Sequence, residues 1–180
     1  MLTVPNLISA VRIAMIPVFW ALIVDEGTTT WGIVLFGVVV ATDWVDGTIA
    51  RRTGQVSELG KVLDPVADRA AIAAGLIALV VRGAFPAWAA ALILVRDVAV
   101  LAAGAVMAAK GLRIEVRWIG KIATFALMIA IPAVSWGSLG LWPAAAALAV
   151  GWPIYVLAIV EYYVAAGAYA VDLRRAMASR

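Results

Sequence analysis

The sequence predicts an all-α integral membrane protein, a bundle of six transmembrane helices, and three observations support this fold class. Of the 180 residues, 66% are hydrophobic and only 14% are charged, which is far from the usual composition of soluble domains. The mean hydropathy is +1.05. A transmembrane helix needs ~20 consecutive, mostly apolar residues, and the chain contains six such stretches. Residues 1–180 are therefore expected to form a single membrane domain without a linker.

The expected spans follow from the apolar stretches, which are residues 5–24, 31–52, 58–81, 86–109, 118–136 and 141–171. The turns after the first five spans contain Gly27, Gly54, Gly83, Gly111 and Gly137. Glycine is common where helices stop, because it adopts backbone conformations that other residues disfavour. The first stretch lacks the basic start and the cleavage site of a signal peptide, so we expect it to be retained as a span.

The distribution of Lys and Arg near the span ends predicts the orientation of the bundle. One side of the membrane is expected to carry Arg51, Arg52, Lys61, Lys110, Arg113, Arg117, Lys121, Arg174, Arg175 and Arg180. The opposite side receives only Arg82, beside Asp25 and Glu26. Because Lys and Arg favour the cytoplasmic side, both termini and the Gly54 turn are expected to be cytoplasmic. The net charge of +3 reflects this asymmetry and gives no sign of nucleic-acid binding.

Four aspartates, Asp43, Asp46, Asp64 and Asp68, lie inside otherwise apolar stretches. A charge in hydrocarbon is costly, so each of these carboxylates indicates a functional site. Residues three or four apart on a helix share one face, and both aspartate pairs have this spacing. An antiparallel hairpin about Gly54 would bring the two pairs to matching depth, facing each other.

These four carboxylates predict a metal site. Carboxylates that converge in a low-dielectric site could not all stay ionised alone, because like charges disfavour one another's ionised form. The chain contains no Cys and no His, and hard oxygen ligands select Mg²⁺, Mn²⁺ or Ca²⁺ over softer metals. A pair of divalent cations would balance the charge. Carboxylates alone could also line an ion pathway or form structural pairs, and the non-enzymatic alternative is a divalent-cation transporter.

The residues between the aspartates favour phosphoryl chemistry. Gly47, Ala50 and Gly60 are small, so a ligand backbone or phosphate could approach closely. Arg51 lies roughly on the face that carries the first aspartate pair, nearer the cytoplasm. A guanidinium beside divalent metal can hold a pyrophosphate and stabilise the charge that shifts to a leaving phosphate.

The pattern Asp43-x2-Asp46-Gly47-x2-Ala50-Arg51-x8-Gly60-x3-Asp64-x3-Asp68 resembles the signature of the CDP-alcohol phosphatidyltransferases. The resemblance implies transfer of the phosphatidyl group from CDP-diacylglycerol to an alcohol, with release of CMP. It also implies two divalent cations, Mg²⁺ or Mn²⁺, and a homodimer with its site at the cytoplasmic face of a bacterial-type plasma membrane.

The same resemblance assigns roles to individual residues. It implies that the four aspartates hold the metals and that Asp68 is also the base that takes the proton of the acceptor hydroxyl. The residues implied to surround the CDP moiety are Gly47, Ala50, Arg51, Ser57 and Gly60. Ser57 can equally be a helix N-cap, and Gly60 can be a packing glycine.

The acceptor is less well defined by the sequence. Pro5-Asn6-Leu7 at the N-terminus and Leu63 to Arg69 resemble the branches of the family that act on glycerol 3-phosphate or phosphatidylglycerol, and a short interfacial helix before the first span is typical there. We expect glycerol 3-phosphate, with phosphatidylglycerol, and hence cardiolipin synthesis, as the alternative. The residues expected to bind the acceptor are Arg96, Arg113, Arg117 and Lys121. For the last three, a purely topological role is the alternative.

Other charged residues within the spans are also interpreted. Arg69 and Asp97 are expected at similar depth, so we predict a buried ion pair between them that leaves Arg96 free for the pocket. Arg12 can either snorkel to the lipid headgroups or reach the active site, and the sequence does not choose between these. Glu161 is expected to serve a partner interface or a structural hydrogen bond.

Overall fold

The structure is a computed structural model that describes the backbone of residues 4–53, 60–109 and 118–178 and side chains within residues 10–42, 66–106 and 122–167 and at residue 171. The described chain consists of α-helices and contains no strand. The helices are α1 (Val4–Val24), α2 (Thr29–Thr53), α3 (Gly60–Val81), α4 (Ala87–Ala109), α5 (Trp118–Ser138) and α6 (Ala144–Ala178). The all-α prediction is therefore confirmed, and each helix coincides with one expected span.

Two details of the helices differ from expectation. Residues 4–24 form one continuous helix, so no separate interfacial helix precedes the first span in the described part of the chain. Pro5 does not interrupt α1, because it lies in the first turn, where its missing N–H has no partner to lose. At the other end of the chain, α6 continues to Ala178, beyond the expected end at residue 171.

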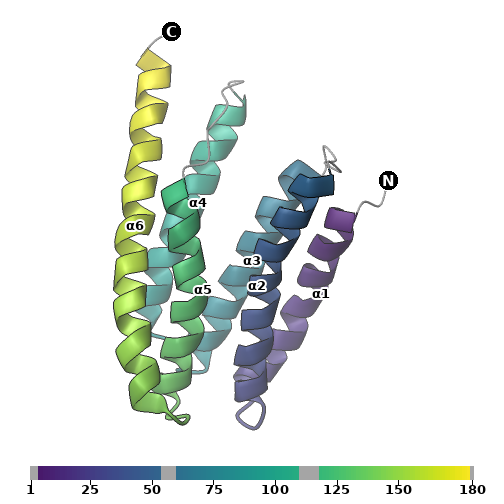
Figure 1. The fold of residues 1–180 in the computed structure, drawn as a ribbon, viewed down its shortest axis with the longest axis vertical. Coiled ribbons are helices and arrows are strands. Elements are labelled where there is room, and N and C mark those ends of the chain that lie inside the picture. The colour runs from purple at the N-terminus through teal and green to yellow at the C-terminus, as the bar shows by residue number, and fades with distance from the viewer. Residues whose placement is uncertain (1–3, 54–59, 110–117, 179–180) are drawn as a thin grey trace.

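The helices pack as two groups of three (Figure 1). In the first group α1 packs against both α2 and α3, and in the second α5 packs along α6 while α4 contacts α6. Contacts of α2 with α5 and of α3 with α4 join the groups. The first turns of α1 and α3 and the last turns of α2 and α6 lie toward the same end of the bundle (Figure 1).

The outer faces of the bundle are apolar, as expected in a lipid surrounding. The segments Ala87–Val106 and Ala144–Gly167 are long and apolar enough to cross a membrane, yet only 28% and 17% of them are buried within the protein. Core helices of soluble proteins would bury such segments. Along α6, the exposed side chains include Val156, Leu157, Val160 and Val164. A helix that is apolar on all sides and largely exposed requires hydrocarbon around it.

Close helix packing depends on small residues. Gly75 of α3 lies under the ring of Phe36 on α2, and a Cβ added there would overlap that ring. The Phe36 ring also packs against Phe19 of α1, with ring centroids 5.4 Å apart. In a membrane, helices associate through such close van der Waals contacts because lipid provides no hydrophobic driving force between them.

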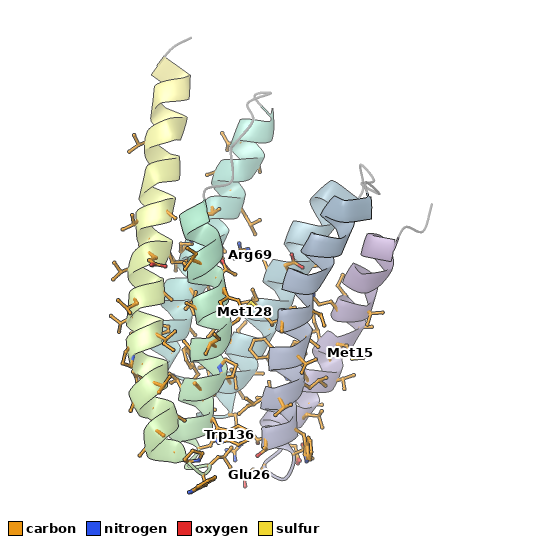
Figure 2. All side chains as sticks on the ribbon, in the orientation of Figure 1. Met15, Glu26, Arg69, Met128 and Trp136 are labelled. Carbon is orange, nitrogen blue, oxygen red and sulfur yellow. The ribbon has the colours of Figure 1, made fainter. Side chains whose placement is uncertain are left out.

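Aromatic and charged side chains gather at the end of the bundle opposite the aspartates. Figure 2 shows Trp136 and Glu26 at this end and Arg69 nearer the middle of the bundle. Trp88 and Trp152 stack with ring centroids 5.7 Å apart. Tryptophans at span ends are typical interfacial anchors.

Candidate active site

The four aspartates lie on two consecutive antiparallel helices. Asp43 and Asp46 are on α2, and Asp64 and Asp68 are on α3. Each aspartate pair therefore lies on a helix, as its spacing predicted. The two helices, α2 and α3, are in contact. The side chains of Asp43, Asp46 and Asp64 lie outside the described residues, so their convergence on metal stays a prediction.

The residues expected to bind CDP follow the same elements. Gly47, Ala50 and Arg51 are in the last turns of α2, and Gly60 is the first residue of α3. Ser57 lies outside the described residues. Their contacts with a nucleotide therefore remain predictions, as does the choice between ligand contact and helix capping for Ser57.

Of the four aspartates in the motif, Asp68 is the one with a described side chain. This side chain is paired with Arg12. The guanidinium of Arg12, on α1, donates from its NH1 atom to Oδ1 of Asp68. The Arg12 side chain is only 5% exposed, against 23% for Asp68. Since α1 packs along α3, Arg12 points into the bundle. Of the two alternatives left open by the sequence, snorkelling to the headgroups does not fit this burial, and Arg12 instead contacts Asp68, the predicted base.

A second polar cluster lies beside this pair and joins α3, α4 and α6. Arg69 donates to Oδ1 of Asp97 at 2.7 Å and to the hydroxyl of Tyr162 at 2.8 Å. The hydroxyl of Tyr162 in turn donates to the same Asp97 oxygen. The predicted ion pair between Arg69 and Asp97 is therefore confirmed. Arg69 belongs to the first helix group and its partners to the second, so the cluster connects the two groups.

Arg96 is part of this cluster, which corrects the expectation that it is free for a pocket. Its side chain is 4% exposed and its NH1 atom lies 3.3 Å from Oδ1 of Asp97. Its guanidinium carbon lies 3.6 Å from the ring centroid of Tyr162, and its Nε donates to the carbonyl of Tyr162 at 3.4 Å. One carboxylate and one aromatic ring thus engage Arg96 while Asp97 also pairs with Arg69. Its expected role in binding the acceptor is not tested by these contacts and stays a prediction.

Tyr162 is the member of the cluster that sequence reasoning did not assign. It is 1% exposed and contacts Arg69, Arg96 and Asp97. The available signal was a tyrosine beside Glu161 within an apolar span. Glu161 itself is partly buried, and its role stays open.

The remaining residues expected to bind the acceptor are not tested by the structure. Arg113 and Arg117 lie outside the described residues. Lys121 is in the first turn of α5, and its side chain is likewise outside the described set.

An apolar cavity lies next to the aspartate end of α2 and α3. It is lined by Phe36, Gly37, Val40, Ile72, Ile93, Thr124, Leu127, Met128, Ile131, Pro132 and Tyr162. Val40 is one turn before Asp43, and Ile72 is one turn after Asp68. The residues next to the aspartates along α2 and α3 therefore line an apolar pocket.

These features define the class of the protein: an integral membrane helical bundle with carboxylates and arginines inside its spans. The chain belongs to the CDP-alcohol phosphatidyltransferase family, whose model matches residues 2–164. The resemblance of the aspartate motif to this family is thereby confirmed, and the protein is a membrane-bound transferase.

Three similar proteins carry names of two kinds. A putative cardiolipin synthase of Mycobacterium tuberculosis is 33% identical over 174 residues, covering 96% of this chain and 83% of the relative. The cardiolipin synthase (CMP-forming) of Streptomyces coelicolor is 33% identical over 180 residues, covering 97% and 84%. The CDP-diacylglycerol–glycerol-3-phosphate 3-phosphatidyltransferase of Bacillus subtilis is 36% identical over 148 residues, covering 74% and 77%.

Proposed function

We propose that this protein transfers the phosphatidyl group of CDP-diacylglycerol to glycerol 3-phosphate, forming phosphatidylglycerophosphate and releasing CMP. The acceptor hydroxyl forms a new bond to the phosphatidyl phosphorus, the bond from that phosphorus to CMP breaks, and Asp68 takes the hydroxyl proton. The observation that carries the proposal is the family's aspartate pattern on the antiparallel helices α2 and α3. Among the three relatives described above, the highest identity, 36%, is to an enzyme named for glycerol 3-phosphate.

The donor set fits two divalent cations, Mg²⁺ or Mn²⁺. Asp43, Asp46, Asp64 and Asp68 would hold them, since the aspartates lie at helical spacing on two helices in contact and the chain has no Cys or His. When bound, the cations would offset charge on the pyrophosphate and on leaving CMP. Arg51 would share the pyrophosphate with them.

Phosphatidylglycerol is the second candidate acceptor, and one observation favours it. Among the three relatives described above, the two named as cardiolipin synthases match 96% and 97% of this chain, against 74% for the enzyme named for glycerol 3-phosphate. Both acceptors present a hydroxyl on a glycerol that also carries a phosphate, so the same site chemistry serves either.

We further propose that the site opens to the cytoplasm and that the protein is a homodimer. The excess of Lys and Arg near one set of span ends supports the orientation. The ends of α1 and α6 nearest the termini lie toward the aspartate end of the bundle (Figure 1), which agrees with it. The homodimer is proposed from the family resemblance.

The test is CMP release by purified protein in detergent with CDP-diacylglycerol and Mg²⁺ or Mn²⁺, with each acceptor supplied separately. Turnover with glycerol 3-phosphate supports the first proposal, and turnover only with phosphatidylglycerol supports the second. Asp68→Asn should keep the fold and abolish CMP release. If CMP is released with neither acceptor, both proposed acceptors are wrong and the choice of alcohol is reopened.

A further inference from the structure

Arg12 is the only charged residue of α1, and its position next to Asp68 calls for an explanation. A guanidinium that is 5% exposed within an apolar span is costly unless its charge is used. Arg12 pairs with one oxygen of Asp68 through one terminal nitrogen. A guanidinium has several N–H donors in a planar fork that matches a phosphate. This chemistry suits Arg12 to an anionic ligand that lies beside Asp68.

The neighbouring arginines with described side chains are committed elsewhere. Arg69 bonds to Asp97 and Tyr162, and Arg96 stacks on Tyr162. Both hold the second cluster together. Among these three arginines, Arg12 is the one in direct contact with an aspartate of the motif.

In a glycerol phosphate, the phosphate lies only a few bonds from the hydroxyl, and therefore close to Asp68, the proposed base. If Asp68 lies within hydrogen-bond reach of the attacking hydroxyl, only the glycerol backbone separates that hydroxyl from the phosphate. The phosphate then lies within a few ångströms of the group that pairs with Asp68. A phosphate so close to carboxylates is stabilised by adjacent positive charge, and Arg12 would supply such charge beside Asp68, in addition to the proposed divalent cations.

We propose that Arg12 binds the phosphate of the acceptor and thereby selects acceptors that carry a phosphate on the glycerol whose hydroxyl attacks. This inference rests on the proposed function and adds to it a residue that determines specificity. The chemistry is shared by free glycerol 3-phosphate and by the phosphodiester of phosphatidylglycerol. Arg12 would contact Asp68 and the phosphate together, holding hydroxyl and base in register.

The experiment compares wild type with Arg12→Gln and Arg12→Lys, using CMP release with glycerol 3-phosphate, with phosphatidylglycerol and with glycerol, which lacks the phosphate. For Arg12→Gln we expect KM for the phosphorylated acceptor to rise about 10- to 100-fold, the scale of one lost charge-assisted hydrogen bond. KM for CDP-diacylglycerol should stay unchanged. The ratio of kcat/KM for the phosphorylated acceptor to kcat/KM for glycerol should fall by the same factor as KM for the phosphorylated acceptor rises.

The other variants separate binding from folding. Arg12→Lys keeps the charge beside Asp68 but loses the fork, so its KM should lie between those of wild type and Arg12→Gln. Arg82→Gln is the matched control, since Arg82 contacts Glu26 and Thr29 at the far end of the bundle. It should leave all constants unchanged. If Arg12→Gln does not fold, Arg12→Lys together with inhibition of wild type and variant by inorganic phosphate gives the same comparison.

The arms of the assay distinguish the outcomes. A rise in KM for glycerol 3-phosphate alone, or for phosphatidylglycerol alone, identifies the physiological acceptor and supports the inference. If kcat falls equally for glycerol and for the phosphorylated acceptors, and the ratio of their kcat/KM values is unchanged, Arg12 is only a structural partner of Asp68. This result would overturn the inference. A wild type that is silent with every acceptor overturns the proposed function itself, and the inference with it.

Discussion

The cluster of Arg69, Arg96, Asp97 and Tyr162 makes a quantitative prediction about stability. Asp97 is 6% exposed on its side chain and accepts hydrogen bonds from both arginines and from the Tyr162 hydroxyl. Asp97→Asn keeps the shape of the side chain but removes the negative charge that the two guanidinium groups share. Two positive charges would then lie in the bundle without the carboxylate that pairs them.

The expected loss can be worked from the geometry. Removing one partner of a buried ion pair typically costs about 3–5 kcal/mol. Arg69 is 27% exposed, which lowers its share through solvent screening. Arg96 keeps its contact with the Tyr162 ring, worth about 0.5–2 kcal/mol, and the amide oxygen of the substituted side chain can still accept a hydrogen bond. We therefore expect Asp97→Asn to lower the free energy of unfolding by about 2–3 kcal/mol.

The assay is reversible unfolding in mixed detergent micelles, followed by tryptophan fluorescence. Asp97→Asn, Arg69→Gln and the double variant form a thermodynamic cycle, and the double variant should be less destabilised than the sum of the two single ones. Asp25→Asn is the control, because Asp25 is exposed and accepts from Thr28 in a turn. A loss below about 0.6 kcal/mol, the average for a hydrogen bond between membrane helices, with no coupling in the cycle would refute the reasoning.

Three further predictions can be checked with the same preparations. Gly75→Ala should destabilise the bundle by about 1–3 kcal/mol, since its Cβ would overlap the Phe36 ring, whereas Gly104→Ala, with open space around it, should not destabilise it. Tyr155→Phe should cost about 0.5–1.5 kcal/mol in unfolding titrations, because the Tyr155 hydroxyl donates to the Ala89 carbonyl at 2.8 Å. Removal of divalent cations with EDTA should abolish CMP release, and addition of Mg²⁺ or Mn²⁺ should restore it; full activity in EDTA would contradict the metal proposal.

The helices were predictable from the sequence because their causes are local. A membrane span must satisfy its backbone hydrogen bonds within itself, so a long apolar stretch forms a helix whatever surrounds it. The six stretches accordingly match α1 to α6. The end of α6 was not predictable from hydropathy, because beyond residue 171 the chain turns polar while the helix continues to Ala178.

The positions of the aspartates along the helices were likewise accessible, as was the pair between Arg69 and Asp97. In both cases the sequence determines depth in the membrane, and an uncompensated charge at a given depth requires a partner at the same depth. That constraint was enough to match Arg69 with Asp97 across two spans.

Depth does not determine which way a side chain points around its helix axis, and this is what the tertiary structure decided. Packing of α1 along α3 directs Arg12 to Asp68, whereas the same residue on an outward face would have snorkelled. Packing of α4 against α6 brings Arg96 onto Tyr162, where it also contacts Asp97. The sequence alone determined the spans, the motif and the depth of each charge. Which charges meet depended on helix rotation and contact, because these are set by side chains far apart in the chain.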